Sequence, residues 1–124
     1  MELELPGGPM APRLARRVVE QRLGGRVPPD VMEDVRLVVS ELVTNSVLHG
    51  RAGPGDHVRL RVSLDGRTVR LEVSDQGPGP PGRRPEPGQD QTGGWGLLLV
   101  DRIAGRWGVD PGRPQTVWAE LSAA

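Results

Sequence analysis

Residues 30–50 read DVMEDVRLVVSELVTNSVLHG, and this stretch decides the fold that we expect. Its apolar residues recur at helical spacing, and Asp30 with Glu33 three residues later forms the pattern of a capping box. Gly50 is suited to end a helix in the left-handed conformation. The stretch therefore predicts one long amphipathic helix over residues 31–49, whose apolar side must pack against other elements.

The segments that flank this helix predict a sheet. Residues 57–64 and 68–73 alternate between apolar and polar side chains, and Asp65-Gly66 between them is a strong hairpin signal. Shorter alternating segments predict further strands over 2–5 and 117–121. Alternation of this kind is typical of strands with one buried face and one solvated face.

Two more helices are predicted from periodicity, over residues 11–23 and about 96–105. In the second of these, Leu99, Ile103 and Trp107 fall on one face. The whole pattern predicts a single α+β domain over residues 1–124. We expect a two-layer sandwich with a mixed, mostly antiparallel sheet and three helices on one face.

The composition excludes several kinds of function. The 124 residues carry 16 basic and 16 acidic side chains, so the net charge of zero does not favour binding to nucleic acid or to an anionic membrane. There is no cysteine, which excludes disulfides and thiolate metal sites. The absence of lysine excludes a Walker-type phosphate loop, and the absence of Phe, Tyr and Lys, whose codons are AT-rich, indicates a bacterial genome of high GC content. No signal-peptide pattern or membrane-length apolar run is present, so we expect a cytoplasmic protein.

Glycine and proline are concentrated in residues 76–94. Between Gly77 and Gly94, 11 of 18 residues are of these two types. A linker between two domains is the alternative, but residues 95–124 are too few to fold alone without a staple. Long loops inside a domain are usually lids or binding loops, so we expect a lid here.

Three polar residues form a stripe on the long predicted helix. Glu41, Asn45 and His49 are spaced four residues apart, so they lie along one side, bordered by apolar residues. A buried Glu or Asn without a partner costs about 1–3 kcal/mol, which a ligand or a metal ion would offset. Two alternatives remain: the stripe is the solvated edge of the helix, or His49 only complements the helix dipole.

A carboxylate and two glycine clusters follow the predicted hairpin. Asp75 ends the second strand, where it either accepts a hydrogen bond from a ligand amine or caps a local turn. Residues 77–82, GPGPPG, formally match a dinucleotide fingerprint, but the prolines after them cannot open the helix that this motif requires. The cluster at 93–96, GGWG, does lead into a helix and is the better phosphate site, or else a simple hinge.

These features occur in the order of three motifs of a known family. ELVTNSVLHG resembles the N box, DQGPG the first glycine box and GGWGL the second glycine box of the GHKL ATPases. The resemblance covers nearly the whole chain and implies the Bergerat ATP-binding fold. The His-Gly ending of the first motif and the small size make the chain most similar to the anti-sigma factor serine kinases of bacteria.

The resemblance implies a role for each matching residue. Asn45 would hold the magnesium ion that bridges the phosphates, Glu41 would be the general base, and Thr44 would touch the terminal phosphate. Asp75 would accept a hydrogen bond from the adenine amine, and Thr116 would lie near adenine. The remaining nucleotide-binding residues implied are His49, Gly77, Gly79, Gly94, Gly96 and the Leu97 amide.

The resemblance also implies an activity and partners. It implies an ATP-dependent, magnesium-dependent transfer of a phosphoryl group to a serine of an antagonist protein, by a homodimer that also binds a sigma factor. The alternative is an ATP-dependent protein-binding module with little kinase activity. Two residues depart from the family pattern, because Pro80 replaces a bulky apolar residue and Thr92 stands where some of these kinases carry Arg. Arg83 and Arg84 in the loop are candidate substitutes for that Arg.

Overall fold

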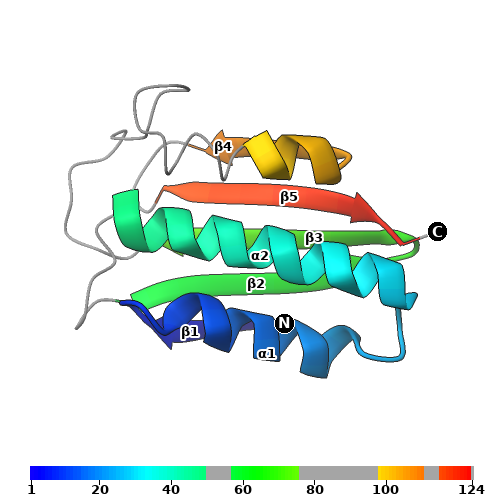
Figure 1. Ribbon diagram of the computed structural model, residues 1–124, viewed down its shortest axis with the longest axis horizontal. Helices are drawn as coiled ribbons and strands as arrows, with labels where there is room; N and C mark the ends of the chain where they lie inside the picture. Colours follow the sequence, from blue (N-terminus) through cyan, green and yellow to red (C-terminus); the bar gives the residue numbers. More distant parts are fainter. Residues whose placement is uncertain (50–56, 76–97, 111–114, 124) are drawn as a thin grey trace.

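A computed structural model describes residues 1–49, 57–75, 98–110 and 115–123 of the chain, and Figure 1 shows how its elements are arranged. Two long helices and five strands carry labels in Figure 1, and residues 98–103 are also helical. The labelled elements are β1 (Glu2–Pro6), α1 (Ala11–Leu23), α2 (Pro29–His49), β2 (His57–Asp65), β3 (Thr68–Asp75), β4 (Arg106–Asp110) and β5 (Thr116–Ser122).

The strands form one sheet in the order β1-β2-β3-β5-β4. Every pairing between the described strands is antiparallel, so the parallel contribution expected in a mixed sheet does not occur among them. The helices lie on one face of the sheet, with α2 across its centre (Figure 1). This arrangement confirms the predicted α+β sandwich of two layers.

The core lies between α2 and the three central strands. Apolar side chains at alternate positions of β2, β3 and β5 are buried, as the sequence alternation predicts. Their partners on α2 include Val35, Val38 and Leu42, all fully buried. Each such side chain contributes about 1.5–3 kcal/mol by leaving water, so this seam fixes α2 against the sheet.

Helix α1 has the predicted bounds, whereas the start of α2 differs from the prediction. Helix α2 begins at Pro29, so Asp30 lies in its first turn and is not the N-cap. Proline is tolerated in the first helical turn, because the N–H that it lacks has no intrahelical acceptor there. In α1 the buried stripe is Ala11, Ala15, Val19 and Leu23, spaced four residues apart.

The helix predicted over about 96–105 ends earlier, at residue 103. Residues from Arg106 onward form β4, so Trp107 is a strand residue and not part of a helical face. The Trp107 indole N–H donates a hydrogen bond of 2.9 Å to Oδ1 of Asp101 in that helix. This hydrogen bond ties β4 to the helix before it.

The face of the sheet opposite the helices carries a grid of ion pairs. Arg70 on β3 donates to Glu72 at 2.8 Å and to Glu120 on β5 at 2.7 Å. The hydrogen bond to Glu72, with that to Glu120, raises the pKa of the Arg70 guanidinium above its usual value. Trp118 lies beneath this grid, with the Arg70 guanidinium 4.5 Å from its ring centre.

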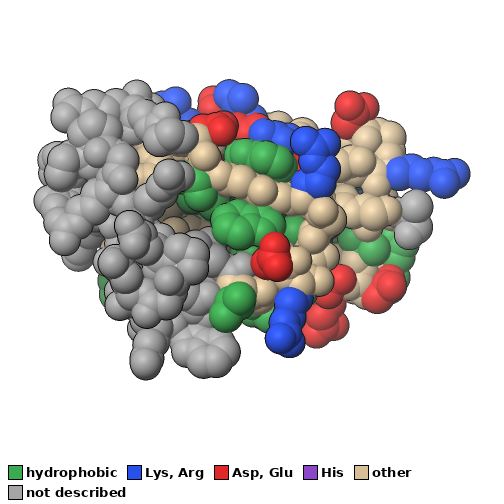
Figure 2. Space-filling view, turned by 90° about the horizontal axis from the view of Figure 1, so that it is seen from above, with side chains coloured by type: hydrophobic (Ala, Val, Ile, Leu, Met, Phe, Trp, Pro, Cys, Tyr) green, Lys and Arg blue, Asp and Glu red, His purple; other side chains and the backbone are tan. Residues whose placement is uncertain are grey.

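The molecule also carries mixed charges along the edge formed by β4 and residues 98–103. Figure 2 shows this side, with hydrophobic side chains at its centre and Arg and carboxylate groups around them. Leu98, one of the few large apolar residues exposed in the described chain, belongs to this helical segment. Among the described helices, none has an apolar stretch long enough to cross a membrane.

Candidate functional site

Helix α2 brings three of the predicted site residues together. Glu41, Thr44 and Asn45 lie within two helical turns, and all three are partly buried. The side chains between them in the sequence, Leu42 and Val43, are fully buried in the core. The three polar groups therefore line the border of the apolar face, as their spacing predicts.

Asn45 carries the most unusual atom of this group. Its side-chain oxygen Oδ1 is buried and accepts no hydrogen bond in the described structure. An amide oxygen left in this state costs about 1–3 kcal/mol, so it is expected to be satisfied by something that binds. A hard cation such as Mg²⁺ accepts a neutral oxygen ligand of this kind.

The remaining ligands of such a cation would have to come from elsewhere. The described residues hold no group of three or more His, Asp or Glu side chains able to bind a metal ion. Mg²⁺ is commonly held by one or two protein oxygens together with phosphate oxygens and water. The residues present therefore fit a cation that arrives with a phosphate-bearing ligand.

Glu41 lies one helical turn before Asn45. Within the described part of the chain, its carboxylate forms no hydrogen bond and no ion pair, although it is only partly exposed. The neighbouring Ser40 is engaged, because Arg16 of α1 donates to its Oγ at 2.8 Å. The Glu41 carboxylate is thus available to accept a proton from a bound group.

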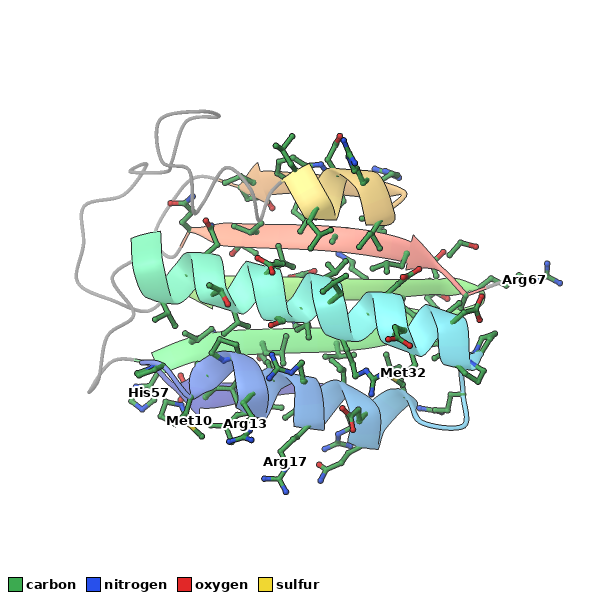
Figure 3. All side chains as sticks on the ribbon, viewed as in Figure 1. Met10, Arg13, Arg17, Met32, His57 and Arg67 are labelled. Atoms are coloured by element: carbon green, nitrogen blue, oxygen red, sulfur yellow. The ribbon has the colours of Figure 1, made fainter. Side chains whose placement is uncertain are left out.

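The C-terminal end of α2, the end of β3 and the start of β5 meet at one edge of the molecule (Figure 1). Asp75 is the last residue of β3, and its backbone pairs with Val58 of β2. This edge therefore brings the segment that contains Asn45 close to the strand end that carries Asp75. The other histidine, His57, is exposed at the start of β2 and points away from α2 (Figure 3).

Thr116 is not placed with these residues. Its hydroxyl forms a hydrogen bond of 2.8 Å with the Ser74 hydroxyl. The neighbours Val73 and Val117 are buried in the core, so Ser74 and Thr116 face the side of the sheet opposite α2. The Thr116 hydroxyl therefore does not face α2, and its place near adenine stays a prediction.

Gln115, which the sequence did not single out, comes directly before β5 and is partly buried. Five predicted residues, Gly77, Gly79, Gly94, Gly96 and Leu97, and the lid over 76–94 lie outside the described residues, as do the side chains of His49 and Asp75.

Comparisons with known proteins show the family and the fold of the chain. The sequence model of the histidine kinase-like ATPase domain family matches residues 6–118. The anti-sigma F factor of Clostridium kluyveri is 42% identical over 50 residues, which are 40% of this chain and 35% of that protein. The anti-sigma F factor of Anoxybacillus flavithermus is 39% identical over 51 residues, again 40% of this chain and 35% of that protein.

A solved structure shows the same fold. The blue-light activated histidine kinase EL346 of Erythrobacter litoralis superposes with a TM-score of 0.59 and 27% identity, over 78% of this chain and 32% of that one. The chain thus matches only about a third of the length of the relatives compared here. The family match itself spans most of the chain, includes the α2 group and the end of β3, and implies ATP binding. The chain belongs to the histidine kinase-like ATPase domain family.

Proposed function

We propose that this domain binds ATP with magnesium and transfers the terminal phosphoryl group to a serine of an antagonist protein, as an anti-sigma regulator. The single observation that carries the proposal is the buried Oδ1 of Asn45, one turn from the Glu41 carboxylate; among the described residues, neither group has a hydrogen-bond partner. The similarity to anti-sigma F factors supports the choice of partners, a sigma factor and its antagonist. The domain is proposed to act as a homodimer in the cytoplasm.

Each group on α2 has a different task in this proposal. Asn45 would hold the magnesium ion through its amide oxygen, and a bound magnesium ion would neutralise charge on the phosphates. Glu41 would accept the proton of the attacking serine hydroxyl, for which it must approach to about 3 Å. Thr44, on the same helix, would donate a hydrogen bond from its hydroxyl to the terminal phosphate.

The base end of the ligand is assigned to the end of β3. Asp75 would accept a hydrogen bond from the adenine amine. The glycines at 77, 79, 94 and 96 and the Leu97 amide would approach the nucleotide through their backbone, and His49 would contact it from the end of α2. Phosphoryl transfer depends mainly on positioning and charge stabilisation, so a small set of groups is sufficient.

The order of effects of two substitutions on α2 tests the proposal. Asn45→Ala is expected to weaken magnesium-dependent ATP binding, because it removes the metal ligand. Glu41→Gln is expected to leave binding nearly intact and to reduce transfer by about 10²–10⁴-fold, as is usual for loss of a general base. Binding is measured by calorimetry with and without magnesium, and transfer by phosphate incorporation into a serine-bearing antagonist protein.

Glu33→Gln is the matched control for the charge change. Glu33 is on the same helix but its side chain is 76% exposed, and it forms an ion pair with Arg36 at 3.9 Å. This variant is expected to bind and transfer as the native protein does. Equal transfer by the native protein and Glu41→Gln would show that Glu41 is not the base.

The second candidate function is an ATP-dependent binding module without transfer. The presence of Thr92 where some related kinases carry Arg favours this candidate, because that position would otherwise supply charge to the phosphates. A native protein that binds magnesium–ATP but neither transfers nor hydrolyses it would support the module. Thr92→Arg is then the variant in which transfer is expected to appear.

A further inference from the structure

Strand β4 is an edge of the sheet, and its outer side has no strand partner among the described residues. The order β1-β2-β3-β5-β4 places β5 on one side of β4 and no described strand on the other. An edge strand presents unpaired backbone N–H and C=O groups, which form a template for pairing with another strand. The outer side of β4 can therefore receive a strand from a second molecule.

The opposite edge of the sheet, β1, is protected against pairing with a second copy of itself. Its two glutamates, Glu2 and Glu4, are held by arginines of β2 in ion pairs of 3.0 and 3.6 Å. Antiparallel pairing of two complete β1 strands would place Glu4 of one copy opposite Glu4 of the other, and like charges that lie opposite each other destabilise a strand pair. Pro6, which has no N–H to donate, is the last residue of the strand.

The sequence of β4, in contrast, is complementary to itself. The strand reads RWGVD, with Arg106 and Asp110 at its ends and Gly108 at its centre. Antiparallel pairing of two copies about Gly108 brings Arg106 of each copy opposite Asp110 of the other. In the same register Trp107 lies opposite Val109. The Cβ atoms of directly opposite residues are about 4.5–5.5 Å apart, which is close enough for ion pairs and for apolar contact.

The side chains that this pairing needs are accessible in the single chain. Arg106 is 74% exposed, although it also forms an ion pair with Glu120 at 3.7 Å. Asp110 is exposed and has no ion pair or hydrogen bond with any residue that the structure describes. Trp107 and Val109 pack against the core but remain partly open to water. Figure 2 shows hydrophobic side chains at the centre of this side of the molecule, with Arg and carboxylate groups around them.

We propose that the outer edge of β4 is the interface of the homodimer, in which two β4 strands pair antiparallel about Gly108. The sheets of the two copies then continue as one sheet across the interface. Such an interface is isologous, so the Arg106–Asp110 pair and the Trp107–Val109 contact each occur twice. The inference rests on the homodimer of the proposed function and gives that homodimer a surface.

Charge reversal on β4 tests the pairing, with the dimer Kd measured by sedimentation. Arg106→Glu would place two acidic groups opposite each other at both symmetry-related positions, so the Kd is expected to rise about 10-fold or more. Asp110→Arg is expected to have the same effect, because it places two arginines opposite each other. The variant with both substitutions restores opposite charges at both positions, and its Kd is expected to return close to the native value.

Arg67→Glu is the matched control for the change of charge. Arg67 is exposed in the turn between β2 and β3, and its side chain points away from the sheet (Figure 3). This variant is expected to dimerise with the native Kd. Denaturant unfolding of every variant distinguishes loss of the dimer from loss of the fold.

Two introduced cysteines detect the pairing directly, because the chain has no cysteine of its own. With Arg106→Cys and Asp110→Cys in one chain, the two thiols of that chain are about 13 Å apart along the strand, too far for a disulfide. Opposite residues of two paired strands have Cα atoms about 4.5–5.5 Å apart, which fits a disulfide. Oxidation is therefore expected to give covalent dimers only when both substitutions are present.

Three outcomes overturn the inference. They are a native dimer that neither single charge reversal weakens, a double reversal that dimerises as poorly as the single ones, and a double-cysteine variant that forms no covalent dimer. Any of them leaves the proposed nucleotide site standing, because ATP binding is measured separately by calorimetry. A native protein that stays monomeric overturns the interface and the homodimer together, and leaves the edge of β4 to a different partner. A protein that dimerises as expected but binds no ATP keeps the interface and overturns the proposed function.

Discussion

Asn45 carries a free-energy cost, because its buried Oδ1 accepts no hydrogen bond from the residues that the structure describes. Asn45→Leu replaces the amide with an apolar group of similar volume and removes that cost. We expect the free energy of unfolding without ligand to rise by about 1 kcal/mol or more, and magnesium-dependent ATP binding to be lost. Thermal unfolding with and without magnesium–ATP measures both effects, and a variant destabilised without ligand would contradict the assignment.

Asp75 is expected to determine which base is accepted. A carboxylate accepts a hydrogen bond from the amine of adenine but opposes the carbonyl of guanine at the same place. A hydrogen bond to a charged group contributes about 1.5–3 kcal/mol, which corresponds to roughly 10- to 150-fold in affinity. The native protein is therefore expected to prefer ATP to GTP by that factor, and Asp75→Ala to bind both with similar affinity in a direct competition measurement.

Gly108 of β4 lies close against the Trp118 ring of β5. A Cβ atom added to Gly108 would lie 2.9 Å from the Trp118 ring, which is closer than side-chain atoms normally approach. Gly108→Ala is therefore expected to lower the free energy of unfolding by about 1–3 kcal/mol through overpacking. In the double variant with Trp118→Val the loss caused by Gly108→Ala should be much smaller, and denaturant unfolding of the four proteins measures this coupling.

The same glycine explains why β4 could not be predicted. In Arg106–Asp110, RWGVD, an exposed Arg, a glycine and only five residues give little alternation. Glycine weakens a strand taken by itself. Here it is required because the Trp118 indole of β5 leaves no room for a Cβ atom at position 108. That information is tertiary, so the local pattern of Leu99, Ile103 and Trp107 misleadingly favoured a longer helix.

The strands β2, β3 and β5 and the helix α2 were predictable for the opposite reason. Each has a buried face whose period is visible in its own residues, as in Val69, Leu71 and Val73 of β3. The polar group on α2 was found because Glu41 and Asn45 interrupt such an apolar pattern at helical spacing.

For the molecule as a whole, the proposed site is placed where the ends of several elements meet and not inside one of them. The last turns of α2, the end of β3 and the start of β5 are held in place by the core that lies further along the same elements (Figure 1). The polar groups at this edge are therefore held in place by apolar packing elsewhere on the same elements. Because the stability comes from that core, the fold tolerates a buried Asn45 oxygen without a hydrogen-bond partner among the described residues.

The order of the strands in the sheet also affects how the chain is made. Strand β3 pairs with β2, which is synthesised just before it, and with β5, which begins about 40 residues after β3 ends. At 5–20 residues per second, a ribosome takes roughly 2–8 s to make that interval. During this time the hydrogen-bonding edge of β3 has no partner, next to the apolar Val69, Leu71 and Val73.

Arg70 and Glu72, which lie between these apolar residues, discourage that open edge from pairing with another chain. Replacing both with threonine is expected to reduce the soluble yield of cell-free synthesis more than it lowers the free energy of unfolding of the purified protein. A loss of yield that only follows the loss of stability would contradict this. Arg70 and Glu72, which form an ion-pair network with Glu120 in the folded sheet, are thus expected to protect the nascent chain from aggregation before Glu120 has been translated.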